Sequence, residues 1–212
     1  MALSSSLNFS LARLDDELDG GIAGELNLIA RSKAGDVQAF NLLVERYEQS
    51  VYAVCFRMLG DTDAADATQE TFLSAFRGIQ GYRGGSFIAW LLRIVRNECF
   101  DQLRARKRRP HVSLTGVANG TDAGDQRVVT REVPDPGEAP DTHVLRAELM
   151  GEIQRRLAEL PADQRLAIIL SDIEGYNHEE IVAATGWRPG TLKSRLSRGR
   201  ARLRDALRAG YA

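Results

Sequence analysis

The chain has 212 residues, of which 43% are hydrophobic, which is enough for one large packed domain or two small ones and excludes global disorder. Its 28 basic and 29 acidic residues give a formal net charge of −1, whereas a stand-alone DNA-binding domain is usually strongly basic. The charges are segregated, however. Lys and Arg gather in 93–109 and 186–208, and acids gather in 13–25, 61–70 and 122–141. This pattern predicts two basic faces for nucleic acid and acidic surfaces for another partner.

Residues that signal other chemistries are scarce. The two cysteines, Cys55 and Cys99, fall within apolar helical patterns, so we expect buried, reduced thiols. No Cys/His cluster has the spacing of a zinc site, and we expect neither a metal nor a cofactor. The sequence lacks a charged segment followed by a signal-type apolar stretch, and no apolar run approaches the ~18 residues of a membrane span. These patterns predict a cytoplasmic protein without a signal peptide or membrane span.

Residues 1–25 are rich in Ser, Asp and Gly and are predicted to form a mobile N-terminal extension. A long helix is predicted at about 36–59, where apolar residues recur at helical spacing, Asp36 can serve as the N-cap and Gly60 ends the pattern. A second helix is predicted to start near Asp63, with a capping box made by this residue and an acid three positions later. Its predicted apolar stripe is Ala65, Thr68, Phe72, Ala75, Phe76 and Ile79.

A glycine-rich loop, 81–86, separates this helix from a third one. The core face of the third helix is predicted to carry Phe87, Trp90, Leu91, Ile94 and Val95. Strand-type alternation is absent throughout the sequence, so the predicted fold class is all-α. Residues 26–109 are predicted to form the first of two small helical domains.

Residues 110–142 are predicted to be a flexible acidic linker, because they contain four prolines and few large apolar residues. A connection of this length is either functional or disordered. Residues 143–212 are predicted to form the second helical domain, whose first helix stops at Pro161. The predicted apolar stripe of that helix is Leu145, Leu149, Ile153, Leu157 and Leu160.

The end of the chain has the pattern of a helix-turn-helix. After a helix at about 162–173, Asn177 and Glu180 are spaced for a capping box. The short helix that follows ends at Gly186, and Pro189 starts an Arg-rich helix. The second helix of such a unit lies in the major groove of DNA. The alternative is a solvated basic helix without a role in DNA binding.

The Arg-rich helix has an apolar side and a polar side. The apolar side is predicted to consist of Leu192, Leu196, Gly199, Leu203 and Leu207. Arg pairs with two acceptors of guanine, and Ser pairs with either base type. The predicted base contacts are Lys193, Ser194, Ser197 and Arg198. Thr191, at the helix start, and Arg202 are predicted to contact phosphates, and Arg195, Arg200 and Arg204 are expected to meet phosphates or solvent.

The third helix of the first domain interleaves basic and aromatic residues beside the glycine loop. Aromatic rings and Arg hold unstacked bases, each worth ~1–3 kcal/mol, which is the chemistry of strand opening. The alternative is that Tyr82, Phe87 and Trp90 are packing residues, and the residues alone leave both interpretations open. The candidates for contact with an opened strand are Tyr82, Arg83, Ser86, Trp90, Arg93, Arg96 and Asn97.

These motifs, in this order and spacing, resemble an extracytoplasmic-function (ECF) sigma factor of bacterial RNA polymerase. The segment DTDAADATQETF at 61–72 resembles the family segment that docks on the clamp helices of polymerase. The segment GYRGGSFIAWL at 81–91 resembles the loop and helix that capture the −10 element. Leu160-Pro161 and GTLKSRLSRGR at 190–200 resemble the domain that reads the −35 element.

The resemblance covers roughly 26–109 and 144–208 and implies an alternative sigma factor that directs promoter-specific initiation. Its implied partners are core RNA polymerase, promoter DNA and an anti-sigma factor. The implied polymerase contacts are Asp63, Asp66, Gln69, Glu70 and Phe72. The acidic linker is expected to thread through polymerase instead of packing on either domain, because its few apolar residues cannot offset the entropy of ordering it.

Two other classes of function compete with this one. A stand-alone helix-turn-helix regulator explains 143–212 but leaves the first domain without a role. An enzyme acting on nucleic acid needs clustered carboxylates or metal ligands, whereas the acids at 61–70 continue along the outer face of a helix. The sequence therefore favours a sigma factor and no enzyme.

Overall fold

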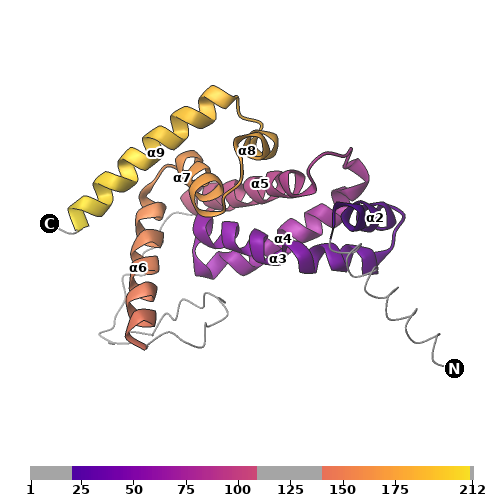
Figure 1. Ribbon diagram of the computed structural model, residues 1–212, viewed down its shortest axis with the longest axis horizontal. Coiled ribbons are helices and arrows are strands. Elements are labelled where there is room, and N and C mark those ends of the chain that lie inside the picture. The colour runs from indigo at the N-terminus through magenta and orange to yellow at the C-terminus, as the bar shows by residue number, and fades with distance from the viewer. Residues whose placement is uncertain (1–20, 109–139, 211–212) are drawn as a thin grey trace, which may run out of the picture.

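The computed structural model of the chain describes residues 21–108 and 140–210 (Figure 1). Within these ranges every regular element is helical, as predicted, and no helix is long and apolar enough to span a bilayer. The predicted extension and linker lie outside the described residues except at 21–25 and 140–142. The elements are α2 (Ile22–Lys33), α3 (Val37–Leu59), α4 (Asp61–Gly78), the 3-10 turn η1 (Ile79–Gly81), α5 (Phe87–Arg108), α6 (Pro140–Glu159), α7 (Ala162–Ile168), the π turn η2 (Ile169–Ile173), α8 (His178–Thr185) and α9 (Pro189–Gly210).

Helix α3 is the central helix of the first half, and its limits agree with the prediction. Asp36 caps its N-terminus by accepting from the backbone N–H groups of Gln38 and Ala39 at 3.0 and 3.1 Å. The bond from Ala39 and the neighbouring Arg31 hold the pKa of Asp36 below its usual value. Gly60 ends the helix with a φ of 87°, in the left-handed region that favours glycine. Local sequence therefore sets both ends of α3.

Helix α4 begins earlier than predicted. It starts at Asp61, directly after Gly60, and has no side-chain cap, so the predicted capping box at Asp63 is wrong. Asp63 instead accepts a hydrogen bond from Nε of Arg106 in α5, at 2.7 Å. The carboxylate thus ties α4 to the end of α5 and does not serve the helix terminus.

The buried face of α4 is made of small residues. It consists of Ala64, Ala67, Thr68, Thr71 and Ala75. The prediction chose the larger apolar side chains and was wrong for Ala65, which is exposed, and for Phe76, which is 41% exposed. Small side chains allow the axes of α3 and α4 to approach closely, so the larger residues are left at the margin of the contact.

Helix α2 is an element that the sequence pattern does not predict. It covers one end of α3 through Leu28 and Ile29, both 4% exposed. The hydroxyl of Tyr47 on α3 donates to the carboxylate of Glu25 on α2. Burial and this hydrogen bond together raise the pKa of Tyr47. The folded part of the chain therefore starts before residue 26.

The second half follows the predicted helix-turn-helix pattern. The predicted helix at 162–173 is α7 continued by the π turn η2. The capping box of α8 is confirmed, with Asn177 Oδ1 accepting from the Glu180 backbone N–H and Glu180 Oε2 accepting from the Asn177 N–H, both at 2.9 Å. Gly186 then turns the chain with a φ of 70°, and Pro189 starts α9.

One residue of α6 contradicts the predicted stripe. Leu149 is 46% exposed, whereas Leu157 and Leu160 are buried. Figure 1 shows α6 extending well past the other helices at its N-terminal end, so only its C-terminal part has a surface to pack against.

The two halves pack against each other. Helix α8 lies on α5, and α6 and α7 contact α3 (Figure 1). The buried residues of both halves form one hydrophobic cluster. The candidate −10 helix, α5, is therefore in contact with the first helix of the helix-turn-helix.

Candidate nucleic-acid interface

Helix α9 is held by one apolar side. Leu192 and Leu196 are 1% and 3% exposed. Gly199, about one turn after Leu196, is also buried. A Cβ at this position would lie 3.0 Å from Ile168 Cγ1 on α7. Glycine lowers helix propensity by up to ~1 kcal/mol, so its use here reflects the close approach of α9 to α7. The residues on the other side of α9 are left facing outward.

The predicted DNA-reading residues occupy that outward side. Four of them are exposed: Lys193, Ser197, Arg198 and Arg202. Thr191 and Ser194 are half-buried, and the Ser194 hydroxyl donates to the Thr191 carbonyl at 3.3 Å. The four exposed residues occupy two flanks of α9, because residues four apart lie on one face of a helix. Lys193 and Ser197 share one flank, and Arg198 and Arg202 share the other.

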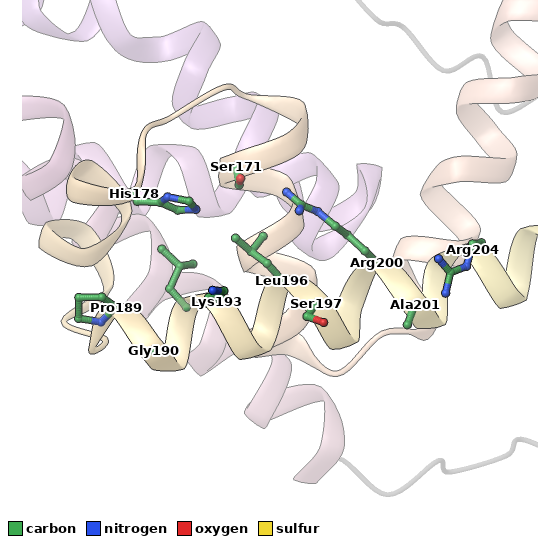
Figure 2. A pocket seen from close by; sticks show the side chains of 11 residues that line it. Ser171, His178, Pro189, Gly190, Lys193, Leu196, Ser197, Arg200, Ala201 and Arg204 are labelled. Carbon is green, nitrogen blue, oxygen red and sulfur yellow. The ribbon is translucent and has the colours of Figure 1, made fainter.

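A shallow groove of about 890 Å³ runs along one flank of α9. Figure 2 shows Lys193 and Ser197 on the same side of the helix as His178 of α8 and Ser171 of η2. Arg200 and Arg204 continue the groove along α9. The groove is therefore open, basic at its rim and continuous with the predicted base-reading surface.

Two arginines of α9 have intramolecular partners. Arg200 donates to both carboxylate oxygens of Asp172, at 2.8 and 2.6 Å, and this arginine holds the pKa of Asp172 below its usual value. Arg195 donates to Asp163 at 2.8 Å. Both arginines, which were expected to meet phosphates or solvent, thus have partners within the protein: Arg195 has a single bond to Asp163, and Arg200 has a bidentate pair with Asp172.

The glycine loop before α5 has a defined conformation. Gly84 and Gly85 have φ values of 96° and 93°, which L side chains rarely adopt. Ser86 Oγ accepts from the Ala89 N–H at 3.3 Å and so caps α5. Arg83 and Ser86 are both exposed, as expected of residues that meet an opened strand.

Tyr82 is buried beside the glycine loop and stabilises its conformation. It is 4% exposed, and its ring packs against those of Phe87 and Trp90, with centroids 5.5 Å away in both cases. Its hydroxyl donates to the Gly85 carbonyl at 2.6 Å, and its own carbonyl accepts from Lys33 Nζ of α2 at 2.8 Å. Tyr82 thus has the packing role that the sequence left as the alternative. Lys33 also stabilises the start of the loop through this hydrogen bond, and the sequence pattern did not indicate this role.

The remaining −10 candidates lie along α5. Trp90 is half-buried, and Asn97 is exposed. Arg93 Nη2 donates to the Ala183 carbonyl of α8 at 2.7 Å. Arg96 is half-buried over the ring of Phe100, 5.1 Å from its centroid. The structure therefore brings this set onto one helix, where Arg93 contacts the second half of the chain and Arg96 contacts Asn97 and Phe100 of α5 itself.

The acidic surface of α4 contains a further set of candidates. Asp66, Gln69 and Glu70 are exposed, whereas Asp63 is paired with Arg106 and Phe72 is half-buried against the core. Two apolar side chains that the sequence reasoning missed extend the same surface. These are Leu73, 38% exposed, and Phe76, 41% exposed. Their spacing from Gln69, four and seven residues, was the available signal.

Metal-ligating residue types do not cluster in residues 21–108 and 140–210. No group of three or more His, Cys, Asp or Glu in those ranges is arranged to hold a metal ion. Cys55 and Cys99 are both free thiols and buried, as predicted.

The geometry defines a class of two-domain helical protein with a helix-turn-helix and a second basic helix. Residues 43–109 match the family model of sigma-70 region 2, and residues 150–203 match that of sigma-70 region 4. The ECF RNA polymerase sigma factor SigE of Mycolicibacterium smegmatis is 39% identical over 166 residues, which are 78% of this chain and 60% of that protein, less than two thirds of its length. The ECF RNA polymerase sigma-E factor of Escherichia coli strain K12 is 34% identical over 177 residues, or 82% of this chain and 88% of that protein.

Two solved structures have similar folds. CnrH in complex with the cytosolic domain of CnrY is 25% identical, with a TM-score of 0.58, and the match covers 86% of this chain and 96% of that one. The sigma factor RpoE in complex with the anti-sigma factor NepR from Bartonella quintana is 28% identical, also with a TM-score of 0.58, over 80% and 96%. The chain belongs to the ECF sigma factors, which direct RNA polymerase to promoters and have no catalytic activity of their own. The family and fold class predicted from the sequence are confirmed, and a stand-alone regulator is not supported.

Proposed function

We propose that the two halves of this sigma factor read the two promoter elements through separate helices. Helix α9 reads the −35 duplex, and α5 with the loop before it holds the opened −10 strand. The observation that supports this division best is the outward side of α9. There, Lys193, Ser197 and Arg198 are exposed on a helix whose opposite side is buried. Major-groove reading needs such a combination of fixed helix and free polar side chains.

On α9, base contacts and phosphate contacts fall to different residues. Lys193, Ser197 and Arg198 contact base edges, with Ser194 beside them at the helix surface. Arg202 lies one turn beyond Arg198 and contacts a phosphate. Thr191, close to the N-terminus of α9, also holds a phosphate through its backbone N–H, since helix N-termini favour anions.

On the −10 side, the loop provides access and α5 provides the contacts. Arg83 and Ser86 stand at the mouth of the site and read the edge of a base that has left the stack. Trp90 contributes a half-buried ring, and Arg93 and Asn97 contact the strand along α5. Arg96 is half-buried and lies beside Asn97. Tyr82 positions the loop from within the core.

Core polymerase binds the acidic surface of α4. Asp66, Gln69 and Glu70 supply charge and hydrogen bonds, and Leu73 and Phe76 supply the apolar contact beside them. Aromatic side chains commonly dominate the energetics of such interfaces. Asp63 and Phe72 act indirectly, because both are held within the domain.

The setting of this activity follows from its partners. The protein works in the cytoplasm, where polymerase and promoter DNA are found, and linker 110–142 threads through polymerase between the two halves. An anti-sigma factor holds the chain inactive. The two similar structures support this last point, since one contains the cytosolic domain of CnrY and the other the anti-sigma factor NepR.

Exchange of the loop sequence at 83–86 tests the −10 assignment. The full chain with core polymerase should lose permanganate-reactive thymines at the −10 element or change its −10 preference, because the exchange alters the base-reading groups. Arg104→Ala is the matched control, since Arg104 is an exposed arginine of α5 that pairs with Asp101 on its own helix. Open complexes with unchanged −10 preference after the loop exchange would contradict the assignment.

A further inference from the structure

The end of α2 is joined to the start of the glycine loop by two hydrogen bonds that run in opposite directions. Lys33 Nζ donates to the Tyr82 carbonyl at 2.8 Å, and Gln80 Nε2 donates to the Lys33 carbonyl. The last carbonyls of a helix lack a partner within it, so Gln80 satisfies one that α2 cannot. Figure 1 shows α2 at the same end of the first half as this loop. The two bonds therefore hold α2 against the turn η1, which it contacts.

The bond from Lys33 sets the direction in which Arg83 leaves the core. The Tyr82 carbonyl and the Arg83 N–H belong to one planar peptide unit, so a donor that fixes the carbonyl also orients the backbone of Arg83. Arg83 is exposed and is one of the proposed base-reading residues. Lys33 is half-buried, and its ammonium makes a charge-assisted hydrogen bond, which is stronger than one between neutral groups.

Lys33 reaches Tyr82 from a separate helix, whereas two other hydrogen bonds of Tyr82 are local. Its N–H donates to the Ile79 carbonyl at 3.1 Å, and its hydroxyl donates to the Gly85 carbonyl at 2.6 Å. Lys33, by contrast, is 49 residues away in the chain. The lysine therefore ties the loop to the body of the first half.

The loop needs such a tie because two glycines follow the anchored segment. Gly84 and Gly85 can leave their present conformation at little steric cost, since glycine has no Cβ. Tyr82 anchors the chain on one side of them, and the cap that Ser86 forms on α5 anchors it on the other. A binding loop that is ordered before its ligand arrives loses less conformational entropy on binding. Anchoring at Tyr82 therefore favours capture of the strand.

Lys33 lies outside every set of contacts assigned above. It is not among the −10 candidates, and the match to sigma-70 region 2 begins at residue 43. Its role therefore follows from the bond that it makes to the loop.

We propose that Lys33 is a positioning residue for −10 recognition: it holds the Tyr82 carbonyl so that Arg83 and the loop that follows meet the opened strand in their binding conformation. The inference rests on the proposed function in assigning −10 reading to this loop. Lys33 acts through Tyr82 and makes no bond to DNA itself. Its loss therefore slows the step in which the strand is captured and leaves recognition of the −35 duplex by α9 unchanged.

Five full-length proteins test this proposal: the wild type, Lys33→Met, Lys33→Arg, Gln80→Leu and Arg77→Met. Lys33→Met removes the donor and keeps a long side chain, whereas Lys33→Arg keeps a cationic donor. Arg77→Met is the control, since Arg77 is exposed in the last turn of α4 and its loss removes a nearby positive charge without touching Tyr82.

Each protein is combined with core polymerase on a promoter that the wild-type enzyme selects from a library. Permanganate reactivity, followed over time at several enzyme concentrations, separates the binding constant of the closed complex from the rate constant of opening. Tryptophan fluorescence measures the loop without DNA. The chain has two tryptophans, so Trp187→Phe leaves Trp90, whose ring centroid is 5.5 Å from that of Tyr82, as the single reporter. Acrylamide quenching in this background reports how well that ring contact is kept.

Lys33→Met should lower the rate constant of opening about tenfold, the size expected for loss of a hydrogen bond to a charged group. Its closed-complex binding constant should stay within about twofold of that of Arg77→Met. Quenching of Trp90 should increase in Lys33→Met, and Lys33→Arg should restore both opening and quenching. Gln80→Leu should change both in the same direction by less, and it replaces Lys33→Met if circular dichroism shows that this variant misfolds.

Three results would overturn the proposal. One is opening by Lys33→Met at the rate of Arg77→Met. Another is slow opening that Lys33→Arg does not restore. The third is unchanged quenching of Trp90 together with a slope of log K against log salt concentration that falls by ~1, because Lys33 would then bind a phosphate directly. A failure of the proposed function appears separately, since the loop exchange at 83–86 would then leave the −10 preference unchanged.

Discussion

The guanidinium of Arg195 lies over the indole ring of Trp187, with Cζ 4.0 Å from the ring centroid, and its Nη2 donates to Asp163 Oδ2 at 2.8 Å. Trp187 is 8% exposed and stands in the turn before α9, whereas Asp163 is in the first turn of α7. Arg195 therefore joins the turn to α7 and fixes the direction in which α9 leaves it.

Arg195→Ala should lower the free energy of unfolding by about 1–2 kcal/mol, because it removes a cation–π contact and a partly exposed ion pair. Urea denaturation of the full chain measures the change. Arg198→Ala is the control, since Arg198 is exposed and has no partner in the described part of the chain, and it should stay within about 0.5 kcal/mol of the wild type. Equal losses in the two variants would contradict a structural role for Arg195.

Gly199→Ala should destabilise the protein by about 1–2 kcal/mol, although alanine is the better helix former. Its Cβ would lie 3.0 Å from Ile168 Cγ1 and 3.4 Å from the Gln164 carbonyl. Gly151→Ala on α6 is the control, because a Cβ there meets nothing within 4 Å, and it should stabilise by about 0.5–1 kcal/mol.

An Ile168→Ala background should reverse the sign of Gly199→Ala, since the added methyl then enters vacated space. A double-mutant cycle on urea midpoints measures this coupling. Stabilisation by Gly199→Ala in the wild-type background would show that α7 yields readily, against the close packing inferred for this contact.

Arg198→Ala and Arg202→Ala should weaken DNA binding in different ways. Loss of Arg198 should cost ~1–3 kcal/mol at the cognate −35 duplex and relax the preference at one base position. Loss of Arg202 should weaken binding to all sequences alike and reduce the slope of log K against log salt concentration by ~1, because a phosphate contact is lost. Binding of the full chain to a −35 duplex and its single-base variants separates the two effects. A sequence profile unchanged by Arg198→Ala removes Arg198 from the base-reading set.

Reversing the charge of Asp66 and Glu70 to Lys should weaken binding to core polymerase about tenfold, because both residues are exposed on the proposed docking surface of α4. Phe76→Ser should weaken it similarly through lost apolar contact. Glu45→Lys/Glu48→Lys makes the same charge change at exposed positions of α3 and is the control. Far-UV circular dichroism should be unchanged throughout. Core affinity equal to that of the wild type in all three variants would place the docking surface elsewhere.

The features that the sequence predicts correctly are local. The cap at Asp36, the capping box of Asn177 and Glu180, and the stop at Gly186 each depend on a few neighbouring residues, so their pattern is visible in the sequence. Contacts between distant residues are not visible in this way. The Arg106–Asp63 bond joins residues 43 apart.

The same limit applies to the candidate site. The Arg93–Ala183 bond joins residues 90 apart, and it gives an intramolecular partner to an exposed residue that the sequence predicts to contact DNA. The buried position of Tyr82 and the exposure of Phe76 also follow from how helices meet, which periodicity within one helix does not report. On α9, the exposure of Lys193, Ser197, Arg198 and Arg202 could be predicted because the apolar stripe fixes the outward side directly.

Run-off transcription with purified core polymerase on a library of promoters is the decisive test of sigma activity in this protein. Adding the full chain should make core enzyme start at a defined set of promoters that share a −35 and a −10 element. The loop exchange at 83–86 should change the preferred −10 sequence, and Arg198→Ala should change the preferred −35 sequence. Initiation that is the same with and without the chain, or a selected set without shared elements, would contradict this activity.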